Sequence, residues 1–415
     1  MIIFFFFQLI MRETLIIIFS ILLNQIYGQQ MELIAGHVLF RHGERTPVKT
    51  FPTDPIQEKD WPNGFNQLTI AGIEQQYRLG KYLRSRYNSI LSTNYVTSEI
   101  YVRSTNYNRT LISAQSNLIG LYPLYNILHD KIPIHTVSIE QDFLLGINNC
   151  PRYDQIQNGT YQSDEFKNMN TYYDPFFKKL QIWTNITEIT MFNALDIADT
   201  IFFAHIYNKT PAWADENVRK NLSNIHDLSF HFLYLNNDSK RIRGGPLIQD
   251  IWINMNNSSR GGTYRKLKMY SAHDTTVSAA LAFLGINCPH QPSYASALFL
   301  DLYKRSSTYY IKVEYLNVTD SNKPYPYLLD SCPTLECPLD TFTAIYRTRF
   351  PASAEVECAI IVPPNDGNNK KMTIILSVVV FGLGIIIIII FGYFYLRRID
   401  RGTPLLSTES RSQTD

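Results

Sequence analysis

The sequence predicts an α/β fold: a central, mainly parallel sheet flanked by helices, a smaller, mainly helical cap domain, and one C-terminal transmembrane helix. Three apolar runs of strand length each end at charged residues and lead into helix-like spacing. This pattern is typical of the carboxyl edge of an open α/β sheet, where ligands usually bind. A polar, aromatic span at about residues 130–240 predicts the cap, and an uncharged run of 25 residues near the C-terminus predicts the membrane helix.

The first strand-like run, residues 32–40, leads into the segment Arg41-His42-Gly43-Glu44-Arg45-Thr46-Pro47. This segment places two guanidiniums and an imidazole within five residues, on a turn that contains a glycine. Arginine forks match phosphate oxygens bidentately, and histidine attacks or shuttles protons near neutral pH. We expect Gly43 to let the backbone approach a phosphate closely.

A helix is expected after Thr69, its predicted N-cap, because apolar side chains then recur at helical spacing at Ile70, Ile73, Tyr77 and Leu83. The second strand, residues 99–102, leads to Arg103, and the third, residues 266–270, leads to His273 and Asp274. Helix-like spacing follows both strands. Two further strands, joined by a short polar turn, predict a hairpin that closes the sheet, at residues 297–303 and 309–316.

The residues around His42 and the pair His273-Asp274 supply the parts of a phosphoryl-transfer site. Hydrolysis of a phosphate ester needs positive charge at the phosphoryl oxygens, an in-line nucleophile and a proton for the leaving oxygen. The residue types suit these tasks, but they do not decide which histidine attacks. We interpret Arg109 as a structural residue rather than a ligand, and His37 as a packed core histidine.

Between about residues 32 and 358, the sequence resembles the histidine acid phosphatases of the lysosomal and prostatic type. The Arg41–Pro47 segment alone is moderately specific, and its combination with His273-Asp274 more than 200 residues later is strong. Other segments match in the family's order, and these are residues 50–55, 61–65, 67–69, 103–105, 149–152, 324–326 and 337–339.

The resemblance implies a membrane-anchored acid phosphatase that hydrolyses phosphomonoesters through a phosphohistidine intermediate. It implies that His42 is the nucleophile, and that Asp274 protonates the leaving alkoxide and then helps to activate water. Asn106 and Asn108 stand where relatives often carry acidic residues, which affects how the local arginines are held. The phosphate-binding residues that the resemblance implies are Arg41, Arg45, Arg103 and His273.

Five cysteines and nine Asn-x-Ser/Thr sequons indicate an oxidising secretory route and a glycoprotein. The resemblance implies two disulfides, Cys150 with Cys358 and Cys332 with Cys337, and it leaves Cys288 unpaired.

Residues 1–28 have the pattern of a signal peptide, with an apolar core at residues 14–23 and a small residue, Gly28, at the expected cleavage point. Initiation at Met11 would remove an unusual apolar run before it. An uncleaved signal anchor is the alternative.

Residues 372–396 form the expected transmembrane helix. At 1.5 Å per residue they reach about 37 Å, enough to cross a hydrocarbon core of ~30 Å. The signal peptide sets the orientation, so we expect a single-pass type I membrane protein. Its ectodomain, residues 29–369, lies outside the cell or in a lysosomal or secretory lumen, and residues 397–415 form a cytosolic tail.

A net charge of +2 gives no reason to expect a nucleic-acid partner. No metal-ligand spacing or P-loop occurs in the sequence, so neither a metal nor another cofactor is expected. The expected partners are a phosphomonoester substrate and the lipid bilayer, and a homodimer is left open.

Two alternatives to a general acid phosphatase stay open. One is a narrower phosphatase for phytate-like or lysophospholipid substrates, which the cap would decide. The other belongs to a different class, a type I receptor or adhesion protein built on an inactive phosphatase scaffold. The intact set of candidate residues argues against this second alternative, because loss of activity usually removes at least one of them.

Overall fold

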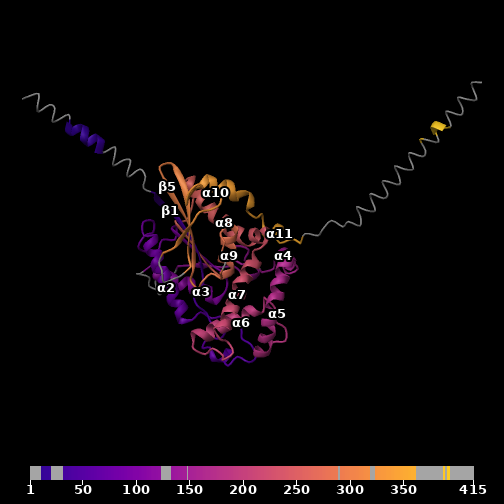
Figure 1. Ribbon diagram of the computed structural model, residues 1–415. Coiled ribbons are helices and arrows are strands. Elements are labelled where there is room, and N and C mark those ends of the chain that lie inside the picture. Colours follow the sequence, from indigo (N-terminus) through magenta and orange to yellow (C-terminus); the bar gives the residue numbers. More distant parts are fainter. Residues whose placement is uncertain are drawn as a thin grey trace, which may run out of the picture. The chain divides into compact units, whose positions relative to one another are not determined.

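The computed structural model describes residues 11–19, 31–122, 132–146, 148–287, 290–317, 323–360, 387 and 390–392. The chain divides into two units, residues 1–360 and 361–415, and the first holds the whole described sheet (Figure 1). Most of the predicted signal peptide and transmembrane helix, the whole predicted tail and Cys288 lie outside the described residues. In the part of the chain that is described, no helix has both the length and the apolar character needed to cross a membrane.

A mixed sheet of eight strands forms the centre of the first unit, in the order β3-β2-β4-β1-β5-β6-β7, with β8 paired to β6. Its strands are β1 (Glu32–Arg41), β2 (Ile100–Ser104), β3 (Ile134–His135), β4 (Leu267–Ala272), β5 (Ala297–Arg305), β6 (Thr308–Leu316), β7 (Tyr325–Tyr327) and β8 (Glu336–Pro338). The pairs among β1 to β4 are parallel, whereas the pairs that involve β5 to β8 are antiparallel. The expectation of a mainly parallel sheet therefore describes only one half of it. The predicted β5–β6 hairpin is confirmed, and because a tight turn reverses the chain, its addition beside β1 makes the other half antiparallel.

Helices cover both faces of the sheet (Figure 1). The helices α2 (Ile70–Arg86) and α3 (Asn108–Leu121) pack together, and α8 (Asn237–Ser259) packs with α9 (Asp274–Phe283). Alternate side chains of β1 enter different cores, as the two-residue period of a strand requires. Val38 and Phe40 join the core beneath α2 and α3, and Leu39 joins the core beneath α8 and α9. The shorter helical elements are α10 (Leu339–Tyr346), α11 (Ala354–Glu357) and the 3-10 turns at Glu58–Asp60, Ile139–Gln141 and Arg347–Arg349.

Four helices occupy the span predicted as a cap, and these are α4 (Pro151–Tyr161), α5 (Asp164–Thr184), α6 (Ala194–Ile206) and α7 (Glu216–Leu233). Figure 1 shows α5, α6 and α7 together beyond one end of the sheet. They share a core of their own that includes Phe177, Leu180, Ile197 and Leu222. However, β3 belongs to the sheet, and α8 continues through residue 240. A separate cap domain at residues 130–240 thus stays a prediction.

The helix α2 begins at its predicted N-cap, where the Thr69 side chain accepts a hydrogen bond from the Gly72 backbone N–H. Its apolar spacing indicated a helix but not the buried face, because Ile70 is 76% exposed and Ile73 and Tyr77 are also exposed. The face against α3 instead carries small residues. A Cβ added to Gly80 would lie 2.0 Å from the Asn117 carbonyl oxygen, so the two helices approach closely only because glycine is there.

Both expected disulfides are present. Cys150 and Cys358 are bonded across 208 residues, and they connect the start of α4 to the end of α11. Cys332 and Cys337 close a short loop before α10. A cross-link over so long a loop stabilises the fold by about 5 kcal/mol in the chain-entropy model, because it restricts the unfolded chain.

Candidate active site

Three parallel strands end at one edge of the sheet and bring the predicted residues together. The strands β1 and β2 both pair with β4, so that Arg41 lies opposite Ala272 and Ser104 lies opposite Ser271. The backbone continues this alignment past the strand ends, since the His42 N–H donates to the carbonyl of Ala272 over 3.0 Å. Residues far apart in the sequence therefore meet here.

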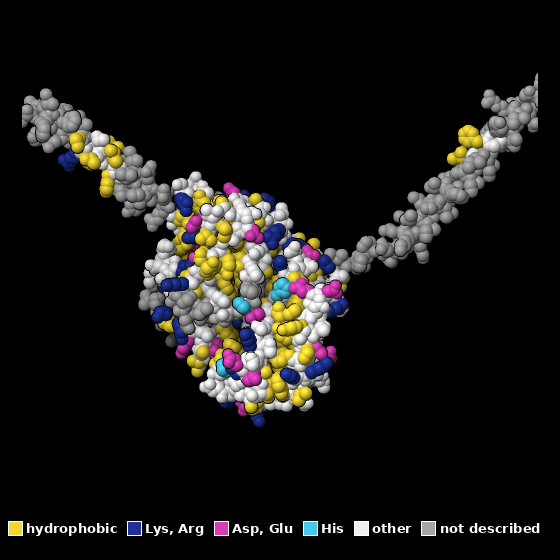
Figure 2. Space-filling view, in the orientation of Figure 1, with side chains coloured by type: hydrophobic (Ala, Val, Ile, Leu, Met, Phe, Trp, Pro, Cys, Tyr) yellow, Lys and Arg dark blue, Asp and Glu magenta, His cyan; other side chains and the backbone are white. Residues whose placement is uncertain are grey.

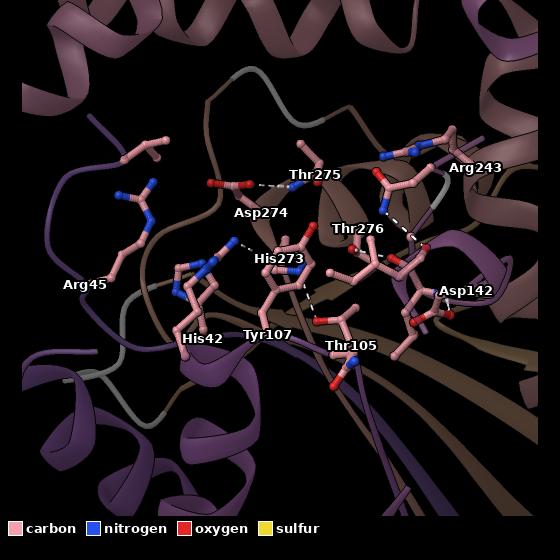
Figure 3. A pocket seen from close by; sticks show the side chains of 17 residues that line it. His42, Arg45, Thr105, Tyr107, Asp142, Arg243, His273, Asp274, Thr275 and Thr276 are labelled. Carbon is pink, nitrogen blue, oxygen red and sulfur yellow. Dashed lines mark hydrogen bonds between the residues drawn. The ribbon is translucent and has the colours of Figure 1, made fainter. Parts of the chain in front are cut away.

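A cavity of about 290 Å³ lies at this edge. In Figure 3, His42 and His273 lie near Asp274, with Arg45 on one side and Asp142 and Arg243 on the other. The remaining lining residues come from the segments after β1, β2 and β4 and from the region before α4, and they are Val48, Thr105, Asn106, Tyr107, Arg109, Ile139, Leu145, Gly146, Asn148, Thr275 and Thr276.

His42 is held in one orientation by its neighbour. Its Nδ1 atom lies 2.8 Å from the Gly43 carbonyl oxygen, which can only accept, so Nδ1 carries the proton and Nε2 keeps its lone pair. Burial, followed by the nearby charges of Arg41 and Arg109, holds the pKa of His42 well below its ordinary value. The ring is therefore neutral, with an unprotonated nitrogen available to react.

Glycine is required at position 43 for a different reason from the one that the sequence suggested. A Cβ added there would lie 2.2 Å from the Gly72 carbonyl oxygen, and one added to Gly72 would lie 2.1 Å from the Glu44 carbonyl oxygen. The glycines thus allow the start of α2 to press against the turn that carries His42.

His273 lies beside His42, with ring centroids 5.6 Å apart. Its Nε2 atom lies 3.0 Å from the Thr105 hydroxyl, which is also hydrogen-bonded to the Thr110 hydroxyl. Its Nδ1 atom lies 3.4 Å from an Arg109 nitrogen, which can only donate, so the neutral ring carries its proton on Nε2. Burial and then Arg109 lower the pKa of His273 to about 3, although Asp274 opposes this.

Asp274 is the first residue of α9, and its carboxylate faces several donors. Arg41 Nη2 lies 2.9 Å from Oδ2, and the Thr275 backbone N–H donates to Oδ1 over 2.7 Å. Burial acts to raise the pKa of Asp274, but Arg41 and Arg45 outweigh it and hold this pKa below its ordinary value. The carboxyl group is therefore ionised when the cavity contains no substrate.

Three predicted phosphate ligands are each paired with a carboxylate. Arg41 contacts Asp274, as described above. Arg45 Nη1 lies 2.9 Å from Asp199 Oδ2, which belongs to α6. Arg103 Nη2 lies 2.8 Å from Asp142 Oδ1. Asp142 lines the cavity, whereas neither Arg103 nor Arg41 is among its lining residues. Arg103 lies behind the Asp142 carboxylate, and Arg41 reaches the edge of the cavity through its contact with Asp274.

Arg109 lines the cavity, although the sequence led us to interpret it as structural. Its guanidinium lies over the Tyr107 ring, 4.6 Å from the centroid, and its buried Nε has no hydrogen-bond partner. Within the described residues, no carboxylate lies within ion-pair distance of it. Burial and the charge of Arg45 lower the pKa of Arg109 to about 10. This cation is thus the member of the cluster whose charge is least neutralised.

Comparison with known proteins shows which family the chain belongs to. The family model described as the histidine phosphatase superfamily, branch 2, matches residues 32–315. The chain belongs to that family. It is 37% identical over 345 residues to the prostatic acid phosphatase of Mus musculus, covering 80% of this chain and 90% of that protein. It is also 37% identical over 342 residues to the human lysosomal acid phosphatase, covering 79% and 81%.

Solved structures of two phytases share the fold. The phytase of Citrobacter braakii aligns with a TM-score of 0.61 at 19% identity, covering 80% of this chain and all of that one. A Hafnia alvei phytase in complex with tartrate aligns with a TM-score of 0.63 at 17% identity, covering 80% and 99%.

In this histidine phosphatase, the sequence identified most of the cluster but missed two of the cations that line the cavity, Arg109 and Arg243. Arg109 lies in the first turn of α3, where a positive side chain opposes the helix dipole. That unfavourable position was the one feature of the sequence that could have marked Arg109 as a functional residue. Arg243, whose guanidinium lies 4.9 Å from the centre of the Tyr153 ring, offered no local signal, because it comes from a helix of the opposite layer.

Proposed function

We propose that this protein is an acid phosphatase that hydrolyses phosphomonoesters through a phosphohistidine on His42. The observation that carries the proposal is the neutral His42 ring, with its Nε2 lone pair free in a cavity whose lining includes Arg45 and Arg109. The family membership supports it, as do relatives named prostatic and lysosomal acid phosphatase.

In the first step, His42 Nε2 attacks phosphorus in line with the leaving oxygen. A nitrogen–phosphorus bond forms, the phosphorus–oxygen ester bond breaks, and Asp274 gives its proton to the departing alkoxide. Arg41 and Arg45 neutralise the charge on the non-bridging oxygens, and His273 hydrogen-bonds the same phosphate. We assign Arg109 to the same task. Arg103, for which the resemblance implied this task, supports Asp142 instead.

In the second step, water attacks the phosphohistidine. Asp274, now a carboxylate, accepts a proton from this water, the phosphorus–nitrogen bond breaks, and His42 returns to its neutral form as inorganic phosphate leaves. The depressed pKa of His42 suits this chemistry in acid, because the nucleophile stays unprotonated there. The proton on Asp274 comes from the medium or from the bound phosphate, whose negative charge raises the pKa of this carboxyl group.

The proposal is tested by assaying the purified protein on p-nitrophenyl phosphate between pH 4 and pH 8. We expect activity that is greatest on the acid side and that is lost in the His42→Ala variant. A protein that is inactive over this whole range, or a His42→Ala variant as active as the wild type, would contradict the proposal.

We also propose the type I membrane arrangement. The uncharged residues 372–396 support a membrane anchor, and the two disulfides support an oxidising compartment around residues 29–369. Chains that end at residue 369 should be secreted from cells, whereas full-length chains should stay with membranes after carbonate washing. Secretion of both forms would contradict the anchor.

The charges on one face of the molecule bear on the size of the substrate. On the face shown in Figure 2, basic and acidic side chains are interspersed, and no extended patch of one sign appears. The positive charge described above is concentrated in the cavity. This favours a small phosphate ester over an extended polyanion.

A further inference from the structure

The proton donor of the proposed reaction is held by a side chain that the mechanism above does not use. Gln291 donates from Nε2 to Asp274 Oδ2 over 2.6 Å. Arg41 Nη2 is also close to this oxygen, but neither Nη2 nor Nε of Arg41 is aligned to form a hydrogen bond. Among the described residues, Gln291 is thus the side chain that makes a directed hydrogen bond to this carboxylate.

Gln291 is itself anchored to the helical layer. Its backbone N–H donates to Asp227 Oδ1 over 3.0 Å, and Asp227 belongs to α7. The other oxygen of Asp227 lies 2.8 Å from His290 Nδ1. Two neighbouring residues are therefore attached to one carboxylate of α7, and this attachment limits where the Gln291 side chain can reach.

The same segment also supports Arg41. The carbonyl of Pro292 accepts a hydrogen bond from Arg41 Nη1 over 2.6 Å, and the ring of Tyr294 lies 3.8 Å from the guanidinium carbon. Arg41 and Asp274 are thus held from one side by residues 291–294.

Arg41 and Gln291 differ in what happens when a phosphate enters. Arg41 is a phosphate ligand in the proposed mechanism, so a bound phosphate competes with Asp274 for its guanidinium. Gln291 lines a second cavity of about 660 Å³, as Arg41 does, but unlike Arg41 it is not a phosphate ligand in the proposed mechanism. We therefore expect its bond to Asp274 to persist with substrate present. An amide is also neutral, so it fixes the carboxyl group without the charge that would oppose protonation.

We propose that Gln291 is the positioning residue of the proton donor, and that Asp227 of α7 holds it in place. This inference rests on the proposed function. Because Oδ2 receives the side-chain donors, the transferable proton of Asp274 resides on Oδ1. Loss of the amide lets the carboxyl group turn away from the leaving oxygen, so the reactions that most need a proton suffer most.

The test is rapid-quench measurement of phosphoenzyme formation by the full chain with two substrates. Glycerol 2-phosphate has a poor alkoxide leaving group, whereas p-nitrophenyl phosphate needs little protonation. In Gln291→Leu, we expect phosphorylation by the alkyl ester to slow about 10- to 100-fold, within the range that general acid catalysis supplies. The aryl ester should slow by less than about threefold, and inhibition by inorganic phosphate should be unchanged. The control variant, Gln115→Leu at an exposed position of α3, should alter neither rate.

A double variant separates positioning from a general loss of structure. If Gln291 acts through Asp274, adding Gln291→Leu to Asp274→Asn should slow the alkyl ester no further. If Gln291→Leu does not fold, Asp227→Ala should show the same leaving-group contrast with a smaller loss.

Two outcomes would overturn the role of Gln291 while the proposed function stands. These are equal losses on both substrates and additive losses in the double variant. A wild-type protein that forms no phosphoenzyme with either substrate would overturn both proposals.

Discussion

Two clusters of buried charge lie on this sheet, and they are balanced in opposite ways. At the edge where β1, β2 and β4 end, the arginines outnumber three carboxylates, which are Asp274, Asp199 and Asp142. At the end of α2, the single Arg86 faces two carboxylates, Asp301 at 2.6 Å and Glu314. In the second cluster, carboxylates of the protein itself neutralise the charge of the arginine. The first retains a positive charge, mainly at Arg109, that a phosphate dianion can neutralise.

The comparison shows how a functional cluster differs from a structural one of similar composition. Each set of residues is largely buried, and each includes arginine–carboxylate pairs with oxygen–nitrogen distances under 3 Å. An unpaired buried cation is costly, so a fold retains it where a ligand supplies the missing charge. We expect substitutions at the first cluster to change activity, and substitutions at the second to change stability.

The largest effect is expected at Arg109. The variant Arg109→Ala should lower kcat/KM on p-nitrophenyl phosphate about 10²- to 10³-fold, as does loss of other preorganised groups that stabilise transition-state charge. Inhibition by inorganic phosphate should weaken as well. The melting temperature should not fall, because a repulsion among cations is removed. A variant with unchanged kinetics would place Arg109 outside the phosphate site.

Arg86→Met should give the opposite result. Removing this cation leaves Asp301, which is fully buried, and Glu314 facing one another without a counter-charge. The free energy of unfolding should fall by about 3–5 kcal/mol. The kcat of the folded fraction should stay near that of the wild type. Denaturant titration and an assay at a temperature below the transition measure both quantities, and a large loss of kcat in folded protein would erase the distinction.

Arg103 provides an intermediate case, because it lies behind Asp142 and does not line the cavity. Arg103→Met should destabilise the fold by about 3 kcal/mol, because it leaves the buried Asp142 carboxylate without its cation. It should reduce kcat/KM about tenfold, well short of the Arg109→Ala effect. If Arg103→Met costs more activity than Arg109→Ala, our exchange of their roles is wrong.

The smallest effects concern stability in acid. As the pH falls, one carboxyl group from each cluster should change the free energy of unfolding, and the two changes should be in opposite directions. The pKa of Asp274 lies below its ordinary value, so this group stabilises the fold above its unfolded pKa, and that stability is lost as the pH falls through the folded pKa. Burial raises the pKa of Asp301, although Arg86 opposes it, so this group favours the folded state increasingly as the pH falls through its folded pKa.

Between pH 6 and pH 2, Asp274→Asn should therefore lose less stability than the wild type, and Asp301→Asn should lose more. Each difference should be on the order of 1 kcal/mol. Urea titrations across this range measure it. Equal pH profiles for the two variants would remove this contrast between the clusters.

The sequence predicted those parts of the site that depend on local order along the chain. A strand followed by a charged turn indicated Arg41, His42, Arg45, His273 and Asp274, and parallel pairing then brought them to one edge. It did not predict which guanidinium near β2 enters the cavity. That depends on how α3 is placed, which in turn depends on the close contact at Gly80 and Asn117.

The sequence missed two further features for a related reason. These are the antiparallel half of the sheet and the hydrogen bond from Gln291 to Asp274. The hairpin was predicted from two strand-like runs joined by a short polar turn, but its place beside β1 is a long-range pairing. Gln291 reaches Asp274 from 17 residues away, through a loop with no repeating pattern. Contacts of this kind depend on the assembled fold and leave no periodic signal in the sequence.

The central claim is that His42 becomes phosphorylated in the cavity where positive charge is left unbalanced. The direct test is rapid acid-free quenching of the enzyme with ³²P-labelled substrate, followed by peptide mapping. We predict an acid-labile label on His42 in the wild type and in folded Arg86→Met, much less label in Arg109→Ala, and none in His42→Ala. A label that persists in His42→Ala, or that maps to His273, would contradict the account.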